Sequence, residues 1–60
     1  MMKAPTTIED WIYRINTEGV NLTKWELDFM ESITDQFLRK NWISDNQEEI
    51  LERIYSEKTS

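Results

Sequence analysis

The sequence predicts an all-α protein, a compact antiparallel three-helix bundle that forms one domain over residues 1–60. Three segments carry apolar residues at the helical period of about 3.6 residues, and none alternates apolar and polar residues over the length of a strand. Two of these segments begin with a hydroxyl residue that is followed three positions later by Glu or Gln, the capping-box pattern. We expect helices over residues 8–17, 24–40 and 45–57, with frayed ends at residues 1–5 and 58–60.

The first helix is expected over residues 8–17. Pro5 and two threonines lead into it, and Thr7 with Asp10 resembles a capping box that uses Asp. Gly19 follows the last turn, where a left-handed residue commonly ends a helix. The apolar face of this helix has the spacing i, i+3, i+4 and i+7 and consists of Ile8, Trp11, Ile12 and Ile15.

The second helix, over residues 24–40, is expected to be the central one. Thr23 and Glu26 form its capping box. Leu27 and Leu38 widen its apolar arc to more than half of the circumference, and a helix of that kind must contact two neighbours. The rest of this continuous arc is formed by Trp25, Phe29, Met30, Ile33 and Phe37.

The third helix, over residues 45–57, begins behind the capping box of Ser44 and Gln47. Its first turn is acidic, which complements the helix dipole. Its apolar face is formed by Ile50, Leu51, Ile54 and Tyr55. Three acid–base pairs at i, i+4 add a few tenths of a kcal/mol each; they are Asp10–Arg14, Asp35–Arg39 and Glu49–Arg53.

A motif covers much of the second and third helices. It reads W-E-x-x-F-x-x-S-I from Trp25 to Ile33 and, after a short connection, I-S-x-x-Q-x-x-I-L-x-R-I from Ile43 to Ile54. With these residues, the stretch from Thr23 to Lys58 resembles a helical segment of small bacteriophage and prophage proteins, some of which act in DNA replication or recombination. The resemblance implies a phage or mobile-element origin and a role near nucleic-acid metabolism, and it carries no active site.

Composition excludes most catalytic and metal sites. The chain has no histidine, the usual general base near neutral pH and the commonest metal ligand, and no cysteine, which removes disulfides and thiolate metal sites. The acidic run that begins at Asp45 lacks the glycine and the ligand spacing of a calcium loop. We therefore expect no enzyme activity, no cofactor and no metal.

Charge and hydropathy bear on location. Twelve acidic and seven basic residues give a formal charge of −5, which opposes binding to nucleic acids and to anionic membranes. No apolar run approaches the roughly 18 residues of a membrane span. The chain starts without the apolar stretch of a signal peptide. We expect a cytoplasmic protein, in the bacterial host cytosol if it is phage-encoded.

Two nucleic-acid-related hypotheses remain open. Arg39, Lys40 and Trp42 form a basic and aromatic cluster on which a base could stack, although the same cations also complement the end of the second helix. The other hypothesis is mimicry of DNA by two acidic helix faces, for which an ordinary solvated surface is the alternative. A helix-turn-helix fails because phosphates would meet the acidic first turn of the third helix.

The remaining signal is an excess of apolar residues. Tyr13, Leu27, Leu38 and Trp42 are hard to bury together in a chain of 60 residues. Contiguous exposed apolar groups mark partner surfaces; alternatively, the two leucines pack under the chain ends. We expect a non-enzymatic helical interaction module that binds a protein partner, or a second copy as a homodimer, through an apolar and acidic surface.

Overall fold

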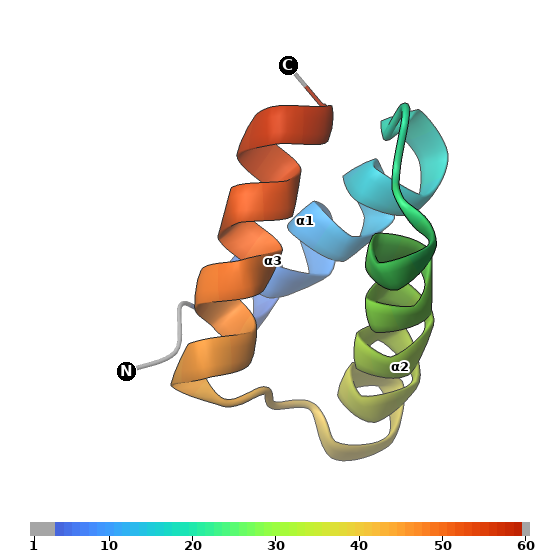
Figure 1. Cartoon of the computed structure of the whole chain (residues 1–60). Helices are drawn as coiled ribbons and strands as arrows, with labels where there is room; N and C mark the ends of the chain where they lie inside the picture. Colours follow the sequence, from blue (N-terminus) through green and yellow to red (C-terminus); the bar gives the residue numbers. More distant parts are fainter. Residues whose placement is uncertain (1–3, 60) are drawn as a thin grey trace.

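The computed structural model describes residues 4–59, which form the predicted all-α three-helix bundle. The helices are α1 (Pro5–Glu18), α2 (Lys24–Lys40) and α3 (Asp45–Lys58). In Figure 1, α2 runs opposite in direction to α3, and α1 crosses obliquely behind them. Residues 1–3 and 60, which belong to the ends predicted to be frayed, lie outside the described residues.

The first helix begins three residues earlier than the capping pattern predicts. Ala4 occupies the N-cap position without a side-chain hydrogen bond, and Pro5 begins the helix. Proline suits this position because its φ is already helical and the missing N–H would have no partner there. The Thr7 N–H already bonds the Ala4 carbonyl at 2.9 Å, so Thr7 lies inside the first turn and does not cap it.

Gly19 ends α1, but not in the predicted left-handed conformation. Its φ is −65° and its ψ is 140°, while the left-handed residues of the described chain are Asn21 and Asn41. A Cβ on Gly19 would lie 2.5 Å from the Ile15 carbonyl oxygen and 2.9 Å from Leu22 Cδ1. Glycine is therefore required by close packing of the chain against the last turn.

Both predicted capping boxes are confirmed. The Glu26 N–H donates to Thr23 Oγ1 at 3.1 Å, and the Thr23 N–H donates to Glu26 Oε1 at 2.8 Å. Ser44 and Gln47 repeat the arrangement at 3.1 and 2.8 Å. Each box satisfies two backbone N–H groups at a helix start, which explains why both starts follow from the sequence.

The core is built from isoleucines of α1 and from aliphatic and aromatic side chains of α2 and α3. Trp11 of α1 stacks on Tyr55 of α3 at 5.6 Å between ring centroids, and both rings pack against this core. Ile43 of the α2–α3 connection is also buried. The buried apolar residues are Ile8, Ile12, Ile15, Met30, Ile33, Phe37, Ile43, Leu51 and Ile54.

The second helix is not the central one, contrary to the prediction. α1 and α3 contact each other more extensively than either contacts α2. The buried residues of α2 are Met30, Ile33 and Phe37. Since these residues form a single line along the helix, two neighbours cover only the middle of the wide apolar arc. Trp25, Leu27 and Leu38 lie at its edges and are exposed.

Polar side chains join the helix starts to neighbouring helices. Glu26 of α2 lies 3.6 Å from the ammonium of Lys58 in α3. Gln36 of α2 and Gln47 of α3 exchange two amide hydrogen bonds, at 3.2 and 3.0 Å. Both contacts use the residue that closes a capping box, so each box also fixes the position of one helix relative to another.

Exposed ion pairs lie on the surfaces of α1 and α2. The described residues form i, i+4 pairs at Asp10–Arg14 (3.1 Å), Lys24–Asp28 (3.3 Å) and Asp35–Arg39 (3.3 Å). The predicted Glu49–Arg53 pair is not among the ion pairs of residues 4–59. Pairs exposed in this way add about 0.3–0.5 kcal/mol each.

The chain near both ends is held in regular structure, although fraying was predicted over residues 1–5 and 58–60. Pro5 belongs to α1 and Lys58 to α3. The Lys58 carbonyl accepts a hydrogen bond from the Val20 N–H at 3.2 Å, and its ammonium donates to the Asn21 carbonyl at 3.2 Å. The end of α3 is thus attached to the α1–α2 connection.

Candidate functional site

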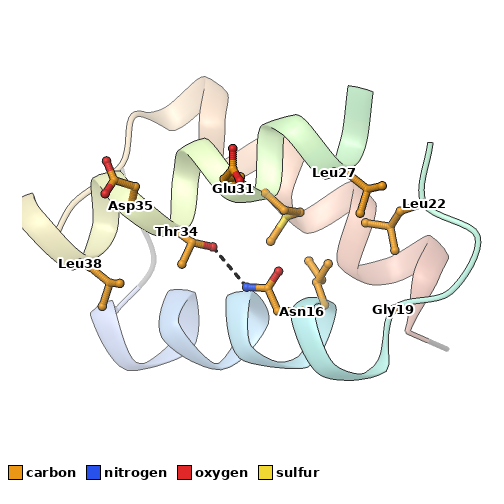
Figure 2. A pocket seen from close by; sticks show the side chains of 10 residues that line it. Asn16, Gly19, Leu22, Leu27, Glu31, Thr34, Asp35 and Leu38 are labelled. Atoms are coloured by element: carbon orange, nitrogen blue, oxygen red, sulfur yellow. Dashed lines mark hydrogen bonds between the residues drawn. The ribbon is translucent and has the colours of Figure 1, made fainter. Parts of the chain in front are cut away.

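A groove of about 490 Å³ lies between α1 and α2. Figure 2 shows it between two helices that run in opposite directions. Ile15, Leu22 and Met30 supply apolar lining, and of these Ile15 and Met30 belong to the core. The groove therefore opens directly onto the hydrophobic core.

Leu27 and Leu38, two of the four residues predicted to bind a partner, both line this groove. Leu38 is 78 % exposed and Leu27 is 56 % exposed. Figure 2 shows Leu38 near one end of the groove and Leu27 beside Leu22 near the other. A separation of eleven residues corresponds to about 16 Å along an α-helix. The two leucines are thus exposed apolar groups at opposite ends of one continuous groove.

A hydrogen bond crosses the middle of the groove. The Asn16 side-chain amide of α1 donates to Thr34 Oγ1 of α2 at 3.2 Å, and Figure 2 marks this bond between the two helices. Sequence reasoning did not select either residue. The available signal was weak: Asn16 follows Ile12 by four positions, which places a polar residue at the edge of the apolar stripe. The centre of the groove is therefore polar, between apolar ends.

Carboxylates line the outer side of the groove. Asp35 is paired with Arg39 at 3.3 Å. Glu31 is exposed and belongs to none of the ion pairs among residues 4–59. Both line the groove together with Leu27 and Leu38. The groove thus combines apolar and acidic side chains.

Tyr13 is separate from the groove. Its side chain is 63 % exposed and lines a shallow hollow on α1 with Thr6, Glu9 and Asp10. Asp10 is engaged by Arg14 in that region, and this hydrogen bond raises the pKa of the guanidinium further. The structure therefore does not join Tyr13 to Leu27 and Leu38 in one patch.

Trp42 lies in the α2–α3 connection, outside the groove, and is 49 % exposed. Its carbonyl accepts a hydrogen bond from Gln36 at 3.3 Å, which holds the backbone of the connection. Of the two cations predicted to accompany it, Arg39 is paired with Asp35, and Lys40 is exposed at the last position of α2. These residues thus offer one exposed indole and one cation, Lys40, that belongs to none of the ion pairs among residues 4–59.

Sequence reasoning missed an exposed aromatic pair. Trp25, predicted to lie in the core, is 59 % exposed and stacks on Phe29 with 5.5 Å between ring centroids. Phe29 is partly buried against the core. Trp25 lies in the first turn of α2, at the edge of the apolar arc, where neither neighbouring helix covers it. Its spacing of four from Phe29 is the only sequence signal for the stack.

Acidic residues gather at the start of α3, where Asp45, Glu48, Glu49 and Glu52 line a second hollow. Glu48 is only 8 % exposed, although it belongs to the acidic first turn of α3. No group of three or more Asp, Glu, His or Cys side chains within residues 4–59 has the arrangement of a metal site. The hollow is an acidic surface.

No protein family model, curated protein or solved structure matches this chain. Among residues 4–59, no helix combines the length and apolar character needed to cross a membrane. Function is therefore inferred from the groove and from the exposed aromatic side chains.

Proposed function

We propose that this protein is a non-enzymatic protein-interaction module that receives an apolar helical segment of a partner in the groove between α1 and α2. The observation that carries the proposal is the placement of Leu27 and Leu38, exposed by 56 % and 78 %, in a groove floored by core residues. Exposed apolar groups gathered in this way mark partner surfaces. A groove between two helices suits the docking of a third.

Burial of the two leucines is the driving force that we assign to binding. Covering a Leu side chain fully contributes about 1.5–3 kcal/mol relative to leaving it in water. Since both leucines are held on one rigid helix, a partner covers them without ordering a loop, which lowers the entropic cost of association. Such a partner would also cover part of the core beneath.

A non-enzymatic role follows from the available chemistry. The chain has neither His nor Cys, the side chains that most often serve as general base and thiolate nucleophile. The carboxylates of the groove, Glu31 and Asp35, are exposed to solvent.

The resemblance of residues 23–58 to helical segments of phage proteins supports an origin in a phage or another mobile element. We accordingly place the module in the cytosol of a bacterial host. The absence of cysteine agrees with a reducing compartment. Partners are then host or phage proteins, including those of DNA metabolism.

The test compares partner capture by three forms of the protein. Wild type, Leu38→Lys and Val20→Lys are immobilised and exposed to host lysate, and captured proteins are identified by mass spectrometry. Val20 is a matched control because it is 60 % exposed and does not line the groove. We expect a protein captured by wild type and by Val20→Lys but lost with Leu38→Lys. Equal capture by all three forms would remove the groove from the proposal.

A second candidate function uses Trp42. Its half-exposed indole next to Lys40 favours stacking of a nucleic-acid base. Titration of fluorescent single-stranded DNA at low salt tests this function, with Trp42→Ala as the comparison. A rise in probe anisotropy that Trp42→Ala abolishes would support an accessory role in nucleic-acid metabolism, and a flat titration would end it.

A further inference from the structure

We infer that the segment received by the groove is a basic amphipathic helix of a different protein, with Lys or Arg between two apolar anchors. This inference rests on the proposed docking function of the groove and adds the chemistry of the partner. Two observations support the inference: the order of the side chains along α2, and the carboxylate of Glu31, which belongs to none of the ion pairs among residues 4–59.

The groove-facing side of α2 repeats at the helical period. Leu27, Glu31, Thr34 and Leu38 have the spacing i, i+4, i+7 and i+11, which places them along one face. Apolar groups form the two ends of this row, and polar groups form its middle. A facing helix that covers both leucines therefore needs apolar anchors about 16 Å apart, the length of three helical turns. Between those anchors it meets Glu31 and Thr34.

The middle of the groove favours a cationic side chain on the partner helix. Asn16 and Thr34 bond each other there, so an apolar side chain would cover polar groups without replacing their hydration. Glu31 has no ion-pair partner within residues 4–59, and the carboxylate of Asp35 is shared with the exposed Arg39. A Lys or Arg on the partner helix would compensate Glu31 while its apolar stem packs along the groove.

A second copy of this chain fits the groove less well. In a two-fold dimer the same patch meets itself, so Glu31 and Asp35 of both copies would come together. Each copy carries a formal charge of −5, which adds repulsion. Four cations are engaged within the chain, in the pairs Asp10–Arg14, Lys24–Asp28, Asp35–Arg39 and Glu26–Lys58. The other two described cations, Lys40 and Arg53, do not line the groove.

A displayed library of helical peptides tests the inference on the full chain. Each peptide has about five turns, with Leu fixed at the two anchor positions and the intervening positions on that face randomised among Lys, Glu, Gln and Leu. We expect selection to enrich Lys between the anchors. The best peptide should lose at least about tenfold in affinity against Leu38→Asp, because one apolar anchor is lost.

Charge is tested with two variants that change the net charge equally. Glu31→Lys should weaken the selected basic peptide about five- to tenfold, the effect of one lost ion pair and one new repulsion. Glu52→Lys lies on α3, outside the groove, and should change affinity by less than about twofold because exposed distant charges are screened. Selection against Glu31→Lys should shift the enriched residue from Lys to Glu.

The outcomes separate the two levels of the proposal. Peptides that depend on Leu38 but show no preference for Lys would overturn the basic partner and leave the docking groove intact. Failure to select any peptide, or peptides indifferent to Leu38→Asp, would overturn the groove itself. Sedimentation tests the remaining alternative, in which a second copy of this chain occupies the groove. A dimer at micromolar concentration that Leu38→Asp dissociates would identify that copy as the occupant and overturn the inference.

Discussion

The carboxylate of Glu26 at the start of α2 lies 3.6 Å from the ammonium of Lys58 at the end of α3. The same Glu26 oxygen accepts the Thr23 N–H at 2.8 Å. One oxygen atom therefore closes a capping box and anchors the last turn of the chain. The two side chains are 14 % and 20 % exposed, which shields the pair more than the exposed pairs elsewhere on the helices.

This arrangement predicts a specific pH dependence. The Thr23 N–H, and then the Lys58 ammonium, hold the pKa of Glu26 below its ordinary value of 4.5, although partial desolvation opposes them. A lowered folded-state pKa stabilises the fold above the unfolded-state value, and this stabilisation is lost as pH falls through the folded-state pKa. Glu26→Gln keeps the capping box, since Gln also closes it. We expect wild type to exceed Glu26→Gln in Tm above about pH 4.5, with the difference shrinking below.

Thermal unfolding followed by circular dichroism from pH 7 to pH 3 measures this difference. Glu52→Gln is the control, because Glu52 is exposed and belongs to none of the ion pairs among residues 4–59. Its Tm should follow that of wild type at every pH. A Glu26→Gln curve parallel to wild type over the whole range would contradict the assigned role.

In the second capping box, the amide of Gln47 also bonds a side chain of the neighbouring helix. Gln47 accepts the Ser44 N–H at 2.8 Å and donates to Gln36 Oε1 at 3.0 Å. Gln47→Glu keeps the acceptor but loses the donor and turns a carboxylate oxygen toward Gln36 Oε1. We expect a loss of about 1 kcal/mol in the free energy of unfolding, the value of one hydrogen bond. Urea unfolding measures it, and no loss would show that Gln36 reorients freely.

Gly19→Ala should destabilise the protein although the backbone there suits any residue. The added Cβ would lie 2.5 Å from the Ile15 carbonyl oxygen, so the backbone must move. We expect a loss of about 1–3 kcal/mol, typical of overpacking. Ser32→Ala, at an exposed position within α2, should be neutral or slightly stabilising. Stabilisation by Gly19→Ala, the usual result of lower chain entropy, would contradict the tight approach.

Substitution of one buried and one exposed leucine tests which side chains belong to the core and which to the groove. Leu51 is completely buried, whereas Leu38 is 78 % exposed. We expect Leu51→Ala to cost about 2–5 kcal/mol, from lost burial and a cavity. Leu38→Ala should change stability by about 0.5 kcal/mol or less. Urea titrations of both variants measure the contrast; a large loss for Leu38→Ala would place that side chain in the core and close the groove.

Local signals explain most of the successful predictions. Thr23 and Ser44 mark helix starts because their side chains bond backbone N–H groups three residues away, a contact that needs no other part of the chain. The bounds of α2 were accordingly predicted without error, and α3 extends one residue beyond its prediction. The start of α1 failed because proline at the first position competes with a weaker Thr–Asp box.

Predictions that depended on packing fared worse. Trp25 shares the apolar arc of α2 with Phe37, yet only Phe37 is buried. The arc indicates which residues could be buried, and the positions of α1 and α3 decide which are. Glu48 belongs to the acidic first turn of α3, and tertiary packing leaves it only 8 % exposed, which the local pattern does not predict.

The sequence by itself determined the number of helices, the starts of α2 and α3, and the surplus of apolar residues. These properties arise from helical periodicity and from hydrogen bonds that span three or four residues. Only the tertiary structure decided that Leu27 and Leu38 share a groove with Glu31, while Tyr13 and Trp42 lie elsewhere. The physical reason is that the sequence and the helical period alone fix which residues share one face of a helix. A groove exists only once a second helix packs beside that face at a particular angle.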